Sequence, residues 1–202
     1  MEPNTIGKGR LEAFSDGVIA IIVTIMVLEL KIPHEGTFDA LKKLGPTFCS
    51  YLLSFLVVAI MWINHHHMIH DFRQVTGSLL WLNMNLLFWM SLIPFVTGWM
   101  GEHSASPLPV ALYGLDLTLC SFAFHLLRGE LICQSEDDDA EMLLYHRKVQ
   151  RKNLFSLITY AASVGLAFVS VFLSFAIFMI IPALYFLPEK RLARVNTQGS
   201  IN

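Results

Sequence analysis

The sequence predicts an all-α membrane protein in which a single domain of 202 residues contains six transmembrane helices. Its composition is 54% hydrophobic and only 15% charged, whereas soluble domains carry about 25% charged residues. The apolar residues form long blocks, and about 20 such residues are enough to cross a bilayer. Lys and Arg are also unequally shared between alternating connections, which is typical of multi-pass membrane proteins.

Four spans follow from the first four apolar blocks. The first is expected at about 13–31, where basic and proline residues end it. The second, at about 46–67, begins at Pro46, because proline is tolerated in the first turn of a helix. The third and fourth are expected at about 77–99 and 107–132.

The last apolar tract is too long for one crossing. Residues 154–187 would form a straight helix about 51 Å long, against a bilayer core of about 30 Å. We therefore expect two helices, at about 152–170 and 172–187, with a turn near 169–174 and a short cytosolic tail at 188–202.

The distribution of Lys and Arg predicts that both termini are cytoplasmic. With the N-terminus inside, three basic residues fall outside, namely Lys31, Lys42 and Lys43. The inner segments hold the other eleven: Lys8, Arg10, Arg73, Arg128, Arg147, Lys148, Arg151, Lys152, Lys190, Arg191 and Arg194. This is the sense of the positive-inside rule. The polar connection at 135–152 is expected to be a cytosolic helical extension.

Several classes of function are disfavoured by composition. A net charge of −2 without a basic domain gives no sign of nucleic-acid binding. The three cysteines, Cys49, Cys120 and Cys133, lack metal-binding spacing and are expected to be buried apolar residues. We expect no enzymatic activity, no catalytic residues, no resident metal and no cofactor.

The first predicted helix has a charge-free stripe. At 100° per residue, one narrow face contains Gly17, Ile21, Thr24 and Leu28, with Ile25 beside it. Asp16 falls on the opposite side, and an ionisable residue in a membrane normally faces protein or water and has a partner. Arg10 is the nearest basic candidate. Spacing alone leaves lipid contact or ordinary helix packing open for the stripe.

The start of this helix resembles a known family. Arg10-Leu-Glu-Ala-Phe14-Ser15-Asp16-Gly17 is similar to the R-x-x-x-F-S-D signature of lysosomal and endosomal potassium channels, in their bacterial single-repeat branch. The resemblance continues to Leu30 and includes Trp62-Ile-Asn-His-His-His67. The six-span layout fits as well.

The resemblance implies a potassium-permeable channel in a prokaryotic plasma membrane, assembled as a homotetramer of this chain and three further copies. The first helix would then line the central pore in place of a carbonyl filter. Ile21 matches the apolar constriction, Thr24 a hydroxyl layer and Leu28 a further apolar ring, with Gly17 and Ile25 on the same face. The permeant K⁺ is the only ion implied.

The same resemblance implies a polar network behind the pore. Arg10, Ser15 and Asp16 match signature residues that hold the first helix within its own subunit, and Phe14 lies among them. Their expected partners are on the second helix: Asn64, His65, His66 and His67.

The histidines keep two other functions open. His66 and His70 have the i, i+4 spacing that can hold zinc, so a histidine-dependent metal or redox protein is one alternative. A proton-coupled carrier that uses Asp16 is another, and a histidine contact with Asp16 would make opening depend on pH. A membrane subunit without transport of its own is the remaining reading.

Overall fold

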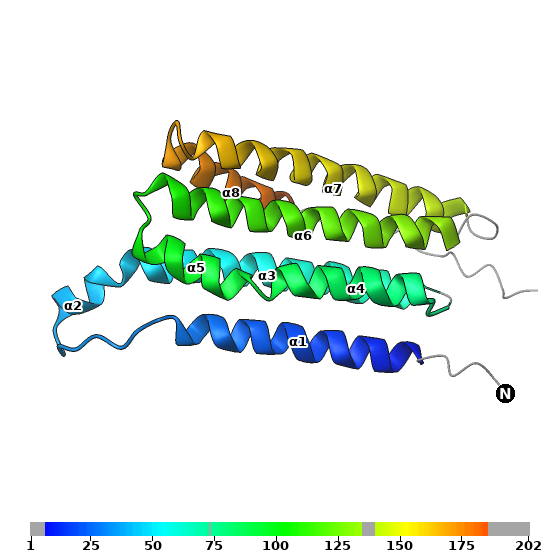
Figure 1. The fold of residues 1–202 in the computed structure, drawn as a ribbon, viewed down its shortest axis with the longest axis horizontal. Coiled ribbons are helices and arrows are strands. Elements are labelled where there is room, and N and C mark those ends of the chain that lie inside the picture. Colours follow the sequence, from blue (N-terminus) through cyan, green and yellow to red (C-terminus); the bar gives the residue numbers. More distant parts are fainter. Residues whose placement is uncertain (1–6, 73, 135–139, 186–202) are drawn as a thin grey trace, which may run out of the picture.

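The computed structural model describes residues 7–72, 74–134 and 140–185, and within these ranges the chain is helical. Figure 1 shows the helices lying side by side along one long axis. In chain order they are α1 (Lys8–Leu28), α2 (Phe38–Lys43), α3 (Gly45–Asp71), α4 (Gly77–Met90), α5 (Ile93–Glu102), α6 (Pro107–Gln134), α7 (Ala140–Leu166) and α8 (Val171–Tyr185). We call the end where α1 begins the inner end and the end that carries α2 the outer end.

Four segments are long and apolar enough to cross a membrane: Lys8–Leu28, Gly45–Asp71, Gly77–Glu102 and Pro107–Gln134. They overlap the first four predicted spans, and the chain is therefore a multi-pass membrane protein. Helix α8 is apolar but shorter, and α7 is more polar. The predicted tail at 188–202 lies outside the described residues.

The third predicted span is broken into α4 and α5. Pro94 stands in the first turn of α5, where its ring and missing N–H interrupt the preceding helix. The break is small, because the Leu92 N–H donates to the Trp89 carbonyl at 3.0 Å and the Val96 N–H donates to the Leu92 carbonyl at 3.2 Å. The two helices therefore continue as one kinked segment.

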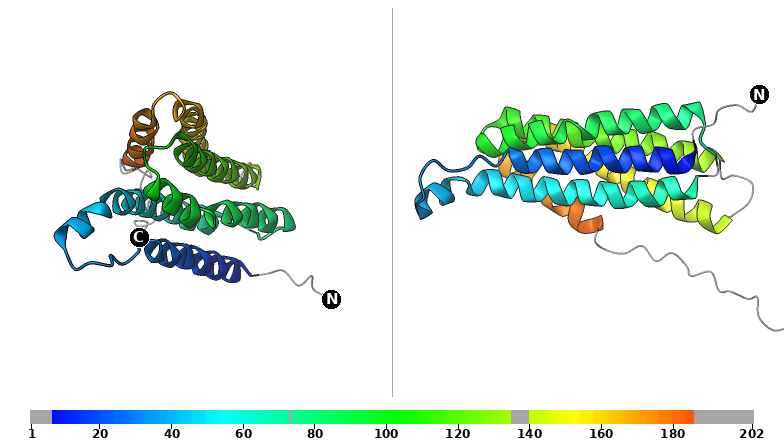
Figure 2. Two further views of the ribbon diagram at one scale, coloured as in Figure 1. Left: turned by 60° about the vertical axis from the view of Figure 1, so that its left-hand side comes forward. Right: turned by 90° about the horizontal axis from the view of Figure 1, so that it is seen from below.

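Helices α7 and α8 form a hairpin whose turn occupies residues 167–170, slightly earlier than the predicted 169–174. The Ser174 hydroxyl closes it by donating to the Ser163 carbonyl at 2.8 Å. Helix α7 packs closely on α6, since a Cβ added at Gly114 would lie 2.6 Å from Ser163 Oγ. Figures 1 and 2 show the described part of α8 reaching part-way along α7.

The short helix α2 was not predicted. It lies in the connection between the first two long helices and projects from the outer end of the bundle (Figure 1). Its N-terminus is capped by Thr37, whose hydroxyl accepts from the Ala40 N–H at 3.2 Å. Lys42 and Lys43 in its last turn suit the negative end of the helix dipole.

Candidate functional site

Helix α1 has one face in the bundle and one face outside it. Its buried face packs against α3, α4 and α5 and consists of Leu11, Ser15, Ile19, Ile22 and Met26. The residues predicted to line a pore are all exposed in the single chain: Gly17, Ile21, Thr24, Ile25 and Leu28. Ile21 and Leu28 are 59% and 72% exposed. In a membrane protein, apolar side chains so placed are covered either by lipid or by another protein surface.

The exposed face is narrow and carries no charge from Gly17 to Leu28. At 3.6 residues per turn, four of the five predicted residues fall within an arc of about 60°. The Thr24 hydroxyl donates to the Ala20 carbonyl at 2.9 Å. Because its proton is used within the helix, the oxygen presents lone pairs to whatever covers this face.

Behind this face, Ser15, Asn83 and His65 form a buried chain of hydrogen bonds. The Asn83 amide donates to Ser15 Oγ at 2.9 Å, and its carbonyl oxygen lies 2.7 Å from His65 Nε2. Ser15 in turn donates to the Leu11 carbonyl at 2.9 Å. If the His65 Nε2–H donates to the Asn83 carbonyl oxygen, each of these hydrogen bonds has one donor and one acceptor, and they all run in the same order from His65 to Leu11. All three side chains are at most 1% exposed.

Two further contacts attach α1 near its inner end. The Trp62 indole N–H donates to Asp16 Oδ1 at 2.8 Å. The Lys8 ammonium donates to the carbonyls of His70 and Phe72, where α3 ends. Asp16 lies about 100° around the helix from Ser15, so the Trp62 and Asn83 contacts together fix the rotation of α1 about its own axis.

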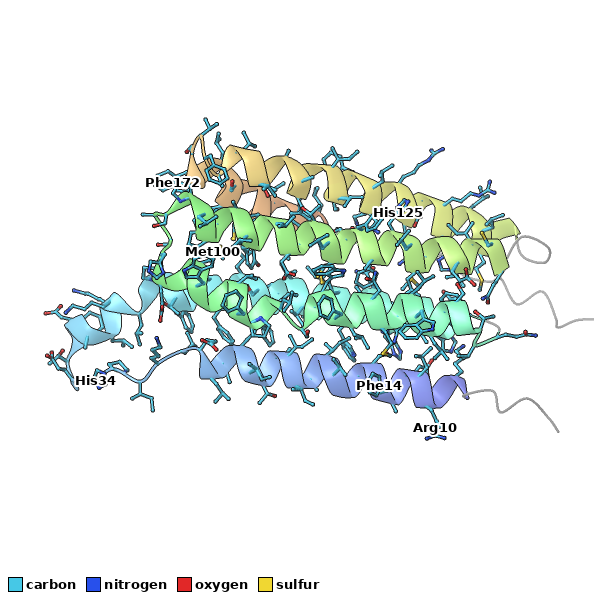
Figure 3. The ribbon with its side chains drawn as sticks, viewed as in Figure 1. Arg10, Phe14, His34, Met100, His125 and Phe172 are labelled. Atoms are coloured by element: carbon cyan, nitrogen blue, oxygen red, sulfur yellow. The ribbon has the colours of Figure 1, made fainter. Side chains whose placement is uncertain are left out.

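The structure brings only part of the predicted network together. Ser15 and His65 meet through Asn83, but Asp16 pairs with Trp62 in place of the expected Arg10 or a histidine. Arg10 is exposed and points away from the bundle in Figure 3.

The other predicted network residues lie outside this chain of hydrogen bonds. Phe14, also labelled in Figure 3, is 53% exposed. His66 and His67 are exposed, and their rings lie 5.8 Å apart. Asn64 donates to the Ile60 carbonyl of its own helix at 2.8 Å.

Sequence reasoning missed Asn83. The signal for it was present, because an amide in the middle of an apolar span is costly unless a neighbouring helix supplies a partner. Its partners could not be read from the sequence, since Ser15 is 68 residues away along the chain.

Charged side chains, namely Glu29, Lys31 and Glu102, lie at the outer end of α1. Lys31 forms an ion pair with Glu102 at the end of α5. The Glu102 carboxylate, through its hydrogen bond and its charge, raises the pKa of the Lys31 ammonium. Glu29 packs over Gly98, where an added Cβ would lie 3.0 Å from its carboxylate oxygen. These residues border an open groove of about 440 Å³.

Within the described residues, no group of three or more His, Cys, Asp or Glu side chains is arranged to hold a metal ion. His66 and His70, which have zinc-like spacing in the sequence, thus have no third ligand of these types in that part of the chain. The three cysteines are free, and Cys49 and Cys133 are exposed where burial was expected.

Comparison with known proteins places this geometry in a family. A model of the family "Endosomal/lysosomal potassium channel TMEM175" matches residues 10–94, which contain most of α1 together with Ser15, His65 and Asn83. A potassium channel of Chryseobacterium sp. (strain P1-3) is 39% identical over 188 residues, which cover 93% of this chain and 96% of that protein. The chain belongs to the TMEM175 potassium channel family. As a member of an ion channel family, it is not an enzyme.

Two further relatives cover most of the chain. A potassium channel of Streptomyces collinus is 34% identical and aligns with 84% of this chain and 86% of its own length. The crystal structure of a lysosomal potassium-selective channel TMEM175 homologue from Chamaesiphon minutus superposes with a TM-score of 0.80 at 26% identity. That match covers 89% of this chain and 96% of the homologue. The arrangement of helices in this TMEM175 chain is thus that of the family.

Proposed function

We propose that this chain is the subunit of a potassium-permeable cation channel in which α1 from four copies lines a central pore. The uncharged, exposed face of α1 carries the proposal, because the subunit buries the opposite face and leaves this one uncovered. Relatives named potassium channels, aligned over nearly the whole chain, support it. The subunit would cross a prokaryotic plasma membrane six times, with both termini in the cytoplasm.

Rings of side chains would control the passage of ions. Four Ile21 and four Leu28 side chains set the width, and such apolar rings can close a pore by expelling water. Between them, Thr24 oxygens replace part of the hydration shell where water is stripped from the ion. Potassium is favoured over sodium because the larger ion loses its water at lower cost. The absence of charge along the face prevents a cation from being trapped.

The buried contacts of α1 give the pore its geometry. Rotating α1 by one residue, about 100°, would turn Ile22 toward the axis and move Ile21 off it, to the position that Ala20 now holds. The Ser15–Asn83–His65 chain opposes such a rotation, because it would break hydrogen bonds that have no water to replace them. We infer that these residues position the pore without contacting the ion.

The channel is tested by reconstituting the purified protein in liposomes under potassium and sodium gradients. Ile21→Asn should change the conductance or the ratio of potassium to sodium permeability. Ile180→Asn is the matched control, since Ile180 is similarly exposed at 56% but lies on α8, remote from the proposed axis. Unchanged currents in Ile21→Asn would refute the assignment of the pore face.

The same recordings distinguish the alternatives. A proton-coupled carrier that uses Asp16 would show slow, saturable flux without single-channel steps. A metal or redox protein would contain bound zinc or show a haem absorption band after purification. A channel shows discrete current steps that reverse near the potassium equilibrium potential.

A further inference from the structure

Asp116 is a buried ionisable side chain that the proposed channel does not use. It belongs to α6, which is long and apolar enough to cross a membrane, and it is only 4% exposed. Both of its carboxylate oxygens are buried and have no hydrogen-bond partner among the described residues. An ionisable group inside a membrane segment is costly and normally has a partner or a function.

The helices around Asp116 offer no basic residue to balance a negative charge. The segment 77–102, which forms α4 and α5, contains no Lys, Arg or His. In α3 the histidines lie at positions 65–70, at the inner end, and α6 has no basic residue before His125. A carboxylate at Asp116 would therefore be a buried charge without a counter-charge, which is strongly destabilising.

The titratable groups on the elements packed around Asp116 do not supply a positive charge either. They are Tyr113 and Cys120 one turn away on α6, Cys49 and Tyr51 on α3, and Glu102 at the outer end of α5. The first four are neutral at ordinary pH, and the glutamate is already paired with a lysine.

The position of Asp116 around α6 directs it toward the broken helix formed by α4 and α5. Glu130 marks the side of α6 that faces α4, since its carboxylate lies 3.5 Å from the Thr76 hydroxyl. Tyr113 marks the side that faces α3, since its hydroxyl lies 3.0 Å from Ser54 Oγ. At 100° per residue, Asp116 falls between the two, about 40° from Glu130 and about 60° from Tyr113.

Asp116 also lies at the level of the break between α4 and α5. Helices α5 and α6 pack together and run in opposite directions from the outer end, where residues 103–106 join them (Figure 1). Asp116 is nine residues into α6, and Pro94 is eight residues before the end of α5. At 1.5 Å per residue, both are about 12–14 Å from that connection.

The break supplies a hydrogen-bond acceptor. Because Pro94 has no N–H, the carbonyl of Met90, four residues earlier, loses its usual helical donor. Met90 is fully buried, so water does not replace that donor. The end of α4 also carries the negative end of the helix dipole, which repels a carboxylate and attracts a proton.

We propose that Asp116 holds a proton under conditions in which exposed aspartates are ionised, and donates it in a hydrogen bond to the Met90 carbonyl at the break. A carboxylate finds no donor there, whereas a carboxylic acid is itself a donor and uses the free acceptor. The site does not depend on where the ion passes, so its failure would leave the proposed function untouched.

Infrared spectroscopy of the full chain in liposomes tests the protonation state, because a carboxylic acid and a carboxylate absorb at separate frequencies. The comparison is made at about pH 6, where an exposed aspartate is ionised. Subtracting the spectrum of Asp116→Asn from that of the parent should leave a carboxylic acid band. Asp39→Asn is the matched control, since Asp39 is exposed on α2 and should leave carboxylate bands only.

Two results of this measurement would overturn the proposal. A carboxylate band in the Asp116→Asn difference would show that the side chain is ionised. A carboxylate band that also shifts between sodium and potassium buffers would show that a metal ion, and not a proton, occupies the site.

Melting of the purified variants tests the hydrogen bond. Asp116→Asn keeps a neutral donor of the same shape and should melt within about 2 °C of the parent protein, whereas Asp116→Leu has no donor and should melt about 2–6 °C lower. Equal melting of the two variants would refute the hydrogen bond to the break.

A labelled parent protein keeps the proposal testable if Asp116→Asn fails to fold. Carbon-13 at the aspartate side-chain carboxyls should shift a carboxylic acid band at about pH 6, and this band should persist in Asp16→Asn and Asp71→Asn. The absence of a label-sensitive acid band, or its loss in either of these variants, would refute the protonated form of Asp116.

Discussion

Replacing Asn83 by alanine removes the residue that joins α1 to α3 through α4. The substitution leaves the Ser15 hydroxyl without its donor and the His65 ring without its acceptor, both fully buried. Neither group can turn to water, so the bundle either keeps two unsatisfied polar groups or lets α1 rotate to relieve them. Stability and the orientation of the exposed face of α1 should therefore change together.

The magnitude follows from the two lost hydrogen bonds. Bonds between helices in membranes contribute on average about 0.6 kcal/mol and at most about 1.7 kcal/mol each. Losing both costs about 1–3 kcal/mol. For a protein of this size, that lowers the melting temperature by roughly 2–12 °C.

Asn85→Ala is the matched control on the same helix. Asn85 is only partly buried and accepts one hydrogen bond, from Trp89 at 3.2 Å. Melting of the purified variants in detergent, followed by size-exclusion chromatography, should give a clearly larger loss for Asn83→Ala. Ser15→Ala combined with Asn83→Ala should cost less than the sum of the two single variants, because both remove the same bond. Equal losses at Asn83 and Asn85, or strict additivity, would refute the network.

Two other predictions follow from the packing and from the charged side chains at the outer end of α1. Gly101→Ala should lower the free energy of unfolding by about 1–3 kcal/mol, because the added Cβ would lie 2.8 Å from a backbone atom of α3. Gly129→Ala is the control, since its added Cβ would have no atom within 4 Å, and it should melt like the parent protein. Equal melting of the two would contradict the close contact. Because Glu102 raises the pKa of Lys31, their ion pair should persist at neutral pH and be lost only as the pH rises above 10.5, the ordinary lysine value. Amine acylation, read by mass spectrometry, should therefore lag at Lys31 relative to exposed Lys43, and Glu102→Gln should remove the lag. A lag that survives this substitution would exclude the ion pair as its cause.

The two faces of α1 could be anticipated because helical periodicity is local. A repeat of 3.6 residues places Ile21 and Leu28 on one side whatever the rest of the chain does. The same periodicity put Asp16 away from that face, and the structure has it half-buried against Trp62. Local pattern thus indicates which side of a helix a residue takes, but not which neighbour it meets there.

Features that depend on distant residues could not be predicted in this way. The kink before α5 was not predicted, because the apolar block runs through Pro94 without interruption and so indicates one span. Only the interpretation of Pro94 as the start of a new helix would have placed the kink there. The pairing of Ser15 with Asn83 and the burial of Arg128 beside His146 depend on how α1, α4, α6 and α7 pack. Neither leaves a periodic signal in the sequence, because each is a contact between single residues on different helices.

The hydrogen bonds of α1 also have a mechanical consequence. Within the described residues, those that join it to other helices involve only Lys8, Ser15 and Asp16. From Gly17 to Leu28 the helix is held by apolar contacts, which have no preferred direction. Helix α1 is therefore held by directional contacts over residues 8–16, and the next such contact comes just beyond its C-terminus, where Lys31 pairs with Glu102. The stretch from Gly17 to Leu28 lies between these two attachments, so in the proposed channel its bending would displace Ile21 and Leu28 together without breaking a hydrogen bond to another helix.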